Sequence, residues 1–224
     1  MSDPTRPHAD PDALLESGAR RLGLSLKPSD LQAMRRYRDE LLRWSERTNL
    51  TALRDPVRLV QDGLLDSLAC LRLIPDSVST AVDIGSGAGF PAIPLALVRR
   101  DIRFTLIEAV RRKTTFLRHV CRLLGLEGVQ VVWARAEDVA REAGHAGAYD
   151  LAMARAAAHP SRQVILAAPF LAAGGIFLGQ LGASCPTAEL QEHLRTLGLA
   201  VATETPLPDF LGGPRRRLVI LRRD

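Results

Sequence analysis

The chain has 224 residues, of which 46% are hydrophobic and 25% charged, a composition typical of one globular domain. No apolar run approaches the roughly 20 residues that a membrane-spanning helix needs, so we expect no contact with a membrane. The net charge is +5 and it is clustered: positions 95–135 carry nine basic and three acidic residues, and the last eleven residues carry five Arg and one Asp. Clustered positive charge favours a polyanion as partner, although a solvated basic face has the same composition.

The ends and the cysteines suggest where the protein works. Residues 1–12 are polar and Pro-rich with no apolar stretch, which predicts a flexible tail rather than a signal peptide. Cys70, Cys121 and Cys185 form no CxxC pair. We therefore expect neither a disulfide framework nor a metal site, and a cytoplasmic location.

The first 75 residues have helical patterns only. We expect a helix over 13–24, a longer one capped by Ser29 or Asp30, and a third at about 56–72. Five apolar residues of the second helix recur at spacings of 3, 3, 4 and 3 and share one face: Leu31, Met34, Tyr37, Leu41 and Trp44. Residues 13–75 are therefore predicted to form a helical N-terminal region.

From residue 80 onward, short apolar runs alternate with helical segments. The predicted strands are 80–85, 104–108, 129–134, 149–155 and 174–181, and the predicted helices are 90–100, 111–124, 136–143 and 160–172. This alternation predicts a parallel, doubly wound sheet. After a helix near 187–197, the runs 199–206 and 216–223 are joined by a loop too short for a crossover, so they should pair antiparallel. Residues 76–224 thus have the strand plan of an α/β, Rossmann-like class I methyltransferase domain, mostly parallel and ending in an antiparallel hairpin.

A glycine-rich loop, AVDIGSGAGFP (81–91), follows the first predicted strand. Glycines at the carboxyl end of an early strand let the backbone approach a ligand. A dinucleotide fingerprint, GxGxxG, needs its third glycine where Phe90 stands. Asp83, two residues ahead of the first glycine, would repel pyrophosphate but can accept a hydrogen bond from an ammonium group. The loop, with Asp83, Gly85, Gly87 and Phe90, therefore favours S-adenosylmethionine over NAD, and the alternative is a tight turn with no ligand.

Further acids stand at the ends of the next two strands. Glu108 ends the second strand, where a carboxylate can accept both hydroxyls of a ribose, although an exposed strand-end Glu is common. After the third strand, Glu137 or Asp138 can accept the adenine amino group while Ala136 leaves room for the ring. An acid in the first turn of a helix is also favoured by the helix dipole alone.

The region after the fourth strand lacks the residues that several methyl acceptors require. ARAAAHP (154–160) stands where amine methylation uses an [Asn/Asp]-Pro-Pro-aromatic turn, no Pro-Cys is present for attack at cytosine C5, and only two lysines are available for a ribose 2′-O tetrad. Guanine N7 is an unprotonated lone pair, so positioning alone can suffice. No catalytic base is identified. Arg155, at the end of the fourth strand, is the candidate for contacting the cofactor or orienting the base, unless it merely pairs with an acid.

Several motifs together resemble one family. RWSERTNLTAL (43–53), LLDSL (64–68), DIGSGAGFPAIPLA (83–96), FTLIEAVRRKTTFLRHV (104–120), RAED (135–138) and ARAAA (154–158) resemble the RsmG family, also called GidB. The resemblance runs from about residue 44 to residue 219 and implies methylation of guanine N7 in 16S ribosomal RNA. It also implies S-adenosylmethionine as cofactor, and the 16S RNA or the 30S subunit as partner. The implied cofactor contacts are Gly85, Phe90, Glu108, Ala136, Glu137 and Arg155.

Three positions depart from the family pattern. Gly63 stands where the family has the His of its HxxDS motif, QLG (180–182) replaces a common Lys-Gly, and Arg217 replaces a His in the last strand. All three lie outside the cofactor motifs. They motivate an alternative, a paralogue that kept the cofactor site but methylates another RNA or a small molecule. Charge alone would fit a non-catalytic RNA-binding module. We expect a monomer, since no apolar stripe is left unexplained.

Overall fold

The computed structural model describes residues 10–155, 159–182, 193–208 and 216–223. Its N-terminal part is helical, as predicted: α1 (Pro11–Arg21), α2 (Pro28–Arg47), and a continuous helical stretch made of α3 (Pro56–Arg58), a π-helical segment (Leu59–Leu65), α4 (Asp66–Ala69) and a 3-10 turn (Cys70–Leu73). Among the described residues, no helix combines the length and apolar character that crossing a bilayer requires.

The first two helices begin earlier than predicted. Pro11 starts α1 because its fixed φ suits the first helical position, and the Asp10 carboxylate caps the helix by accepting from the Asp12 N–H at 3.0 Å. Residues 11 and 12 are therefore not part of a flexible tail, and residues 1–9 lie outside the described residues. In α2 the same role of Pro28 places Asp30 inside the first turn, where its carboxylate accepts from the Lys27 N–H at 3.2 Å.

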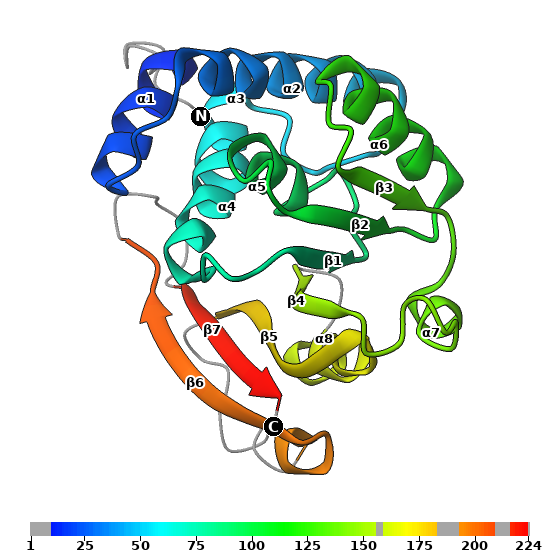
Figure 1. Cartoon of the computed structure of the whole chain (residues 1–224). Coiled ribbons are helices and arrows are strands. Elements are labelled where there is room, and N and C mark those ends of the chain that lie inside the picture. The colour runs from blue at the N-terminus through cyan, green and yellow to red at the C-terminus, as the bar shows by residue number, and fades with distance from the viewer. Residues whose placement is uncertain (1–9, 156–158, 183–192, 209–215, 224) are drawn as a thin grey trace.

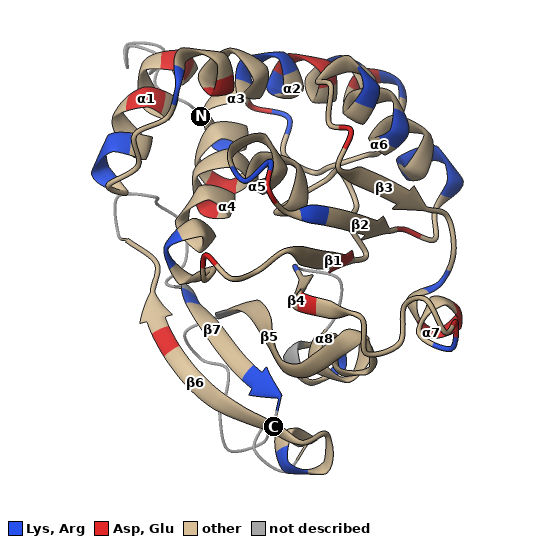
Figure 2. Cartoon of the chain, viewed as in Figure 1, with Lys and Arg blue, Asp and Glu red and all other residues tan. Residues whose placement is uncertain are grey.

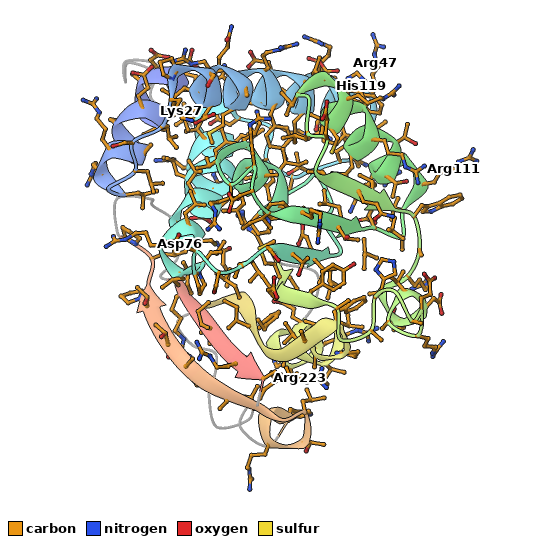
Figure 3. The ribbon with its side chains drawn as sticks, in the orientation of Figure 1. Lys27, Arg47, Asp76, Arg111, His119 and Arg223 are labelled. Atoms are coloured by element: carbon orange, nitrogen blue, oxygen red, sulfur yellow. The ribbon has the colours of Figure 1, made fainter. Side chains whose placement is uncertain are left out.

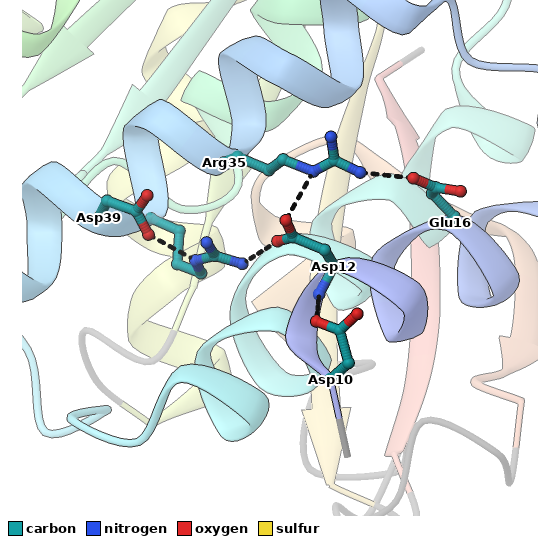
Figure 4. A network of polar contacts seen from close by, with 6 residues as sticks. Asp10, Asp12, Glu16, Arg35 and Asp39 are labelled. Carbon is teal, nitrogen blue, oxygen red and sulfur yellow. Dashed lines mark hydrogen bonds and ion pairs between the residues drawn. The ribbon is translucent and has the colours of Figure 1, made fainter. Parts of the chain in front are cut away.

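Ion pairs fasten α1 to α2. Figure 4 shows Asp12 between two arginines of α2: Arg35 Nε lies 3.1 Å from its carboxylate, and the Arg38 guanidinium pairs with its other oxygen. Arg35 also pairs with Glu16, and Arg38 donates to Asp39 at 2.7 Å. Arg35, Asp12 and Glu16 are partly exposed, so their pairs orient α1 more than they stabilise the fold, whereas Arg38 is buried.

A seven-stranded sheet runs through the molecule in the order β3-β2-β1-β4-β5-β7-β6. Its strands are β1 (Thr80–Ile84), β2 (Arg103–Ile107), β3 (Val129–Val132), β4 (Tyr149–Ala154), β5 (Leu171–Gly182), β6 (Leu199–Pro206) and β7 (Arg216–Arg223). The first five are parallel, and β7 pairs antiparallel with both β5 and β6. The predicted fold class, with its closing antiparallel pair, is confirmed.

The crossover helices are α5 (Ala92–Val98), α6 (Arg111–Leu123), α7 (Ala136–Val139) and α8 (Pro160–Ala167), and a 3-10 turn (Ala168–Phe170) follows α8. Several boundaries differ from the prediction: α7 ends at Val139 rather than 143, and α8 ends at Ala167 rather than 172. α5 starts at Ala92 rather than 90, with Pro91 as its N-cap residue, and Gly89 before it has a left-handed φ of 106°. β5 starts at Leu171 rather than 174 and shifts register against β4 between Tyr149 and Leu151. Of the helix predicted near 187–197, residues 193–197 fall within the described part, and 193–196 are helical.

Helices cover both faces of the sheet (Figure 1). On one face, α5 and α6 lie with the N-terminal helices, and one buried cluster joins Leu15, Met34 and Tyr37 of those helices to Ala81 and Leu151 of the sheet. On the other face, α7 and α8 pack over a second cluster. The predicted boundary at residue 75 thus marks a change of secondary structure, and both parts share one core.

Candidate functional site

A cavity of about 700 Å³ opens at the carboxyl ends of β1, β2 and β4. Eight of its thirteen lining residues come from the sheet and the segments that follow its strands, and they include five of the predicted site residues: Gly85, Gly87, Phe90, Glu108 and Arg155. The other five come from the helical N-terminal region and form what we call the helical half of the site: Leu50, Thr51, Leu53, Arg58 and Asp62. The site therefore lies where the two parts of the chain meet, and no residue of the helical half was predicted from the sequence to belong to it.

The glycine loop is held in a conformation that depends on glycine. Gly85, Gly87 and Gly89 all have positive φ, at 68°, 60° and 106°. A Cβ on Gly89 would lie 2.6 Å from Cγ1 of Ile93 and 3.0 Å from the Tyr37 hydroxyl oxygen. The loop is therefore packed tightly against α5 and α2, while Gly85 and Gly87 expose backbone to the cavity.

Glu108 fastens the loop to the end of β2. Its side chain is buried, its Oε2 accepts from the Gly87 N–H at 2.9 Å and its Oε1 accepts from the Val110 N–H at 2.8 Å. A carboxylate has about four acceptor positions, so each oxygen can still accept a further bond from a ligand in the cavity.

Asp83 lies beneath the loop rather than in the cavity lining. It is fully buried, and both carboxylate oxygens lack a hydrogen-bond donor among the described residues. The Ser86 hydroxyl donates to the Asp83 backbone carbonyl at 3.0 Å. Burial raises the pKa of the Asp83 carboxyl to about 7, and nearby Ser86 and Arg155 offset this only in part.

Arg155 links β4 to the helical region. Its Nη2 lies 3.2 Å from Oδ2 of Asp66, a fully buried residue, and also donates to the backbone carbonyl of Asp62. The guanidinium carbon lies 5.8 Å from the centre of the Phe90 ring. The acid pair that was the alternative interpretation of Arg155 is thus present, and it places the guanidinium at the cavity wall. Asp66 belongs to the LLDSL motif, which was the available signal for it.

The Phe90 ring is fixed from two sides. The Tyr37 ring centre lies 5.4 Å away, and its hydroxyl donates to the Ala88 carbonyl at 2.7 Å. A Cβ on Gly63 would come within 2.8 Å of Cζ of Phe90. Gly63, a departure from the family pattern, therefore makes room for the ring. Tyr37 was predicted only as a core residue, because helical periodicity does not show what a hydroxyl contacts.

Ala136 and Glu137 are not among the cavity-lining residues. They begin α7, where Ala136 packs in the second cluster and the Glu137 carboxylate lies 3.6 Å from Nη2 of Arg162. Of the other departures, Arg217 pairs with Glu204 across the β6–β7 hairpin at 3.0 Å, and Gln180 lies opposite Leu218 in β5. Within the described part of the chain, no group of His, Cys, Asp or Glu is arranged to hold a metal ion.

The doubly wound sheet, its antiparallel end and the glycine loop over the cavity define a class I S-adenosylmethionine-dependent methyltransferase. Solved structures share this fold: an S-adenosylmethionine-dependent methyltransferase from Aquifex aeolicus superposes with a TM-score of 0.59 at 16% identity, covering 79% of this chain and 97% of that one. M. jannaschii TYW2 in complex with AdoMet superposes with a TM-score of 0.54 at 17% identity, covering 67% of this chain and 72% of that one.

Sequence comparisons identify the family. The family model described as GidB, rRNA small subunit methyltransferase G, matches residues 30–219. The chain is 37% identical to ribosomal RNA small subunit methyltransferase G of Symbiobacterium thermophilum, over 94% of this chain and 89% of the relative. It is 38% identical to the protein of the same name from Chloroflexus aggregans, over 90% of this chain and 85% of the relative. The chain belongs to the rRNA small subunit methyltransferase G family.

Proposed function

We propose that this protein transfers a methyl group from S-adenosylmethionine to N7 of a guanine in 16S ribosomal RNA. The observation that carries the proposal is the two-sided cavity, in which the glycine loop and Glu108 face a second wall built from the helical region. Such a cavity can hold a nucleoside cofactor and an acceptor base side by side. Membership of the rRNA small subunit methyltransferase G family supports RNA as the acceptor.

The residues of the sheet half fit the cofactor. Glu108 is a buried carboxylate with remaining acceptor positions at the place where a ribose is expected. Asp83 is a buried acid without a hydrogen-bond donor among the described residues, which suits the ammonium of the methionine end. When bound, the cofactor supplies a methyl group on a positively charged sulfur. In the proposal, Gly85, Gly87 and Phe90 shape its methionine side.

The adenine contact is proposed for Ala136 and Glu137, which lie outside the cavity lining. Glu137 is only partly buried, and its pairing with Arg162 involves two surface side chains at 3.6 Å. A surface pair of this kind is weak, so the carboxylate is available to another donor.

The acceptor half suits a reaction that needs no general base. Of the described residues that line the cavity, none is His, Cys or Tyr, and the two acids are both engaged, Glu108 with the loop and Asp62 with Arg58 at 2.8 Å. Guanine N7 carries an accessible lone pair, so holding it in line with the methyl group is the main requirement. Arg155, fixed by Asp66 and Phe90, is the positioning residue we assign to this step.

The acceptor in the cell is proposed to be 16S RNA, free or within the 30S subunit, and the enzyme a cytoplasmic monomer. Incubation of the protein with radiolabelled S-adenosylmethionine and 30S subunits or naked 16S RNA, both from a strain lacking the modification, tests this. Labelled RNA supports the proposal and shows which form is the substrate. Cofactor binding without labelled RNA would instead favour the alternative, in which the departure at Gly63 accompanies a different acceptor.

A further inference from the structure

One exposed aromatic residue has no role in the cavity. Trp133 follows β3 and is 51% exposed. The indole is nevertheless held in place, since its Nε1–H donates to the Ala109 carbonyl at 2.9 Å and the Arg111 guanidinium carbon lies 5.5 Å from the ring centre. Val110, between these two partners in the chain, is 40% exposed. An ordered, exposed indole beside a guanidinium is a surface on which a planar base can stack.

Trp133 lies on the α6 side of the sheet. Successive strand residues point to opposite faces. Val129 and Val131 pack with the cluster on the α6 face, whereas Val132 and Ala134 pack with the cluster on the α7 face. Trp133 therefore points away from the face to which Ala136 belongs, so it is separate from the proposed adenine contact. It remains close to the cofactor strand, because the Glu108 N–H donates to the Val132 carbonyl at 3.1 Å.

A groove of about 600 Å³ lies between α6 and the edge strand β3, and its lining reaches Val131, two residues before Trp133. Arg118 and Arg122 line it, with Val131 and Leu126 as apolar floor and Glu127 as the one acid among its described lining residues. Arg118 is positioned over the strand, where its Nη2 donates to the Val131 carbonyl at 3.3 Å.

Three basic residues of α6 share one exposed face. Arg111, Arg118 and Arg122 are spaced seven and four residues apart, which places them along one side of the helix, and all three are exposed. Figure 2 shows the basic residues along α6, and Figure 3 shows Arg111 projecting outward at this side of the molecule. By contrast, two arginines of β7 are engaged within the protein: Arg217 pairs with Glu204, and Arg223 donates to two backbone carbonyls.

We propose that the edge groove between α6 and β3 binds a single-stranded segment of the RNA substrate, with one unpaired base stacked on Trp133 and phosphates along Arg118 and Arg122. The inference rests on RNA being the substrate, as proposed above. Unpaired bases stacked on aromatic side chains, with arginines on the backbone, are the usual means of binding single-stranded RNA. The groove would anchor RNA beside the cavity without taking part in methyl transfer.

The test measures binding of a fluorescein-labelled, ten-nucleotide single-stranded RNA by anisotropy across a salt series. Trp133→Ala should weaken binding about tenfold, while Trp133→Phe, which keeps an aromatic face, should stay within about threefold of the wild type. Arg118→Ala/Arg122→Ala should make the slope of log K against log salt less negative by about 1.4, at about 0.7 for each phosphate that the protein no longer neutralises. RNA should quench the indole fluorescence of the wild type, and this part of the quenching should be absent from Trp133→Phe.

The matched control removes two exposed arginines elsewhere, Arg20→Ala/Arg36→Ala on α1 and α2, and should change the salt slope little. Circular dichroism checks that each variant is folded. Because Trp133 is exposed, its replacement should leave the fold intact. Calorimetry with S-adenosylmethionine should give wild-type affinity for Trp133→Ala. Wild-type RNA binding by the groove variants would overturn the inference, as would an equal loss in the control pair. Loss of cofactor affinity with RNA binding intact would instead assign Trp133 to the cofactor.

Failure of the groove and failure of the proposed function are distinguishable. Labelling of 30S subunits by the wild type tests the reaction without reference to Trp133. If the wild-type protein labels RNA and Trp133→Ala binds RNA normally, only the proposal of an RNA-binding groove is refuted. If the wild-type protein binds RNA through Trp133 but transfers no label to it, only the proposed methylation reaction is refuted.

Discussion

Replacing Glu108 by Ala is the perturbation that most directly probes the sheet half of the site. The carboxylate accepts from the Gly87 and Val110 N–H groups at 2.9 and 2.8 Å and is assigned to the cofactor ribose. A hydrogen bond to a charged group contributes about 1.5–3 kcal/mol. Losing even one such bond to the ribose corresponds to about 10- to 150-fold weaker cofactor binding.

The same substitution also loosens the loop. Each N–H left without an acceptor costs about 1–3 kcal/mol, and water entering from the cavity replaces part of the loss, so we expect the free energy of unfolding to fall by about 1–3 kcal/mol in total. Isothermal titration calorimetry measures the affinity, and urea denaturation measures the stability. Reduced stability with unchanged affinity would show that Glu108 only supports the loop, and would refute its assignment to the ribose.

Asp150→Ala is the matched control. The Asp150 carboxylate also accepts backbone N–H bonds, from Ser79 and Thr80 at 2.9 Å each, but at the amino end of the sheet. Burial raises its pKa, and the hydrogen bonds from Ser79 and Thr80 more than offset this, so the net shift is downward. Its removal should lower stability and leave cofactor affinity unchanged.

Three further outcomes are expected. Tyr37→Phe removes the buried hydrogen bond to the Ala88 carbonyl, so it should lower the free energy of unfolding by about 1 kcal/mol and weaken cofactor binding. Unchanged values in urea denaturation and calorimetry would show that the Tyr37 hydroxyl does not support the loop. Gly63→His should cost about 1–3 kcal/mol by displacing the Phe90 ring, and less when combined with Phe90→Leu; additive effects in the double-mutant cycle would contradict the contact. The pKa of Asp83 is about 7 in the folded state against an ordinary 3.8, so between these pH values the folded state binds a proton that the unfolded state has lost. The free energy of unfolding should therefore fall as pH rises from about 4 to about 7. Asp83→Asn should flatten this pH dependence in urea titrations, and an unchanged slope would contradict the raised pKa.

Local patterns were enough to predict most of the fold. Alternating apolar runs and helical segments led to the parallel strands, and the short loop after Pro206 led to the antiparallel end. The errors fell at the ends of elements: Pro11 and Pro28 start their helices earlier than predicted, and α5 starts two residues later. The short helix α7 was also predicted to extend to 143, four residues beyond its end at Val139.

The site was predictable only in its sheet half. Gly85, Gly87 and Glu108 stand at the ends of predicted strands, so the sequence could place them at the edge of the sheet where the cavity opens. The opposite wall comes from residues 50–62, whose place depends on how the helices pack on the sheet. The pair between Asp66 and Arg155 joins residues 89 positions apart, which no local pattern reveals.

The position of the transferred methyl group tests the proposed reaction most directly. After incubation of the enzyme and cofactor with 30S subunits lacking the modification, reduction by borohydride followed by aniline cleaves RNA at 7-methylguanine. We expect a single new cleavage site in 16S RNA, absent without cofactor and strongly reduced with Glu108→Ala. Methylated RNA that resists this cleavage, or no methylated RNA from a protein that binds the cofactor, would contradict guanine-N7 transfer.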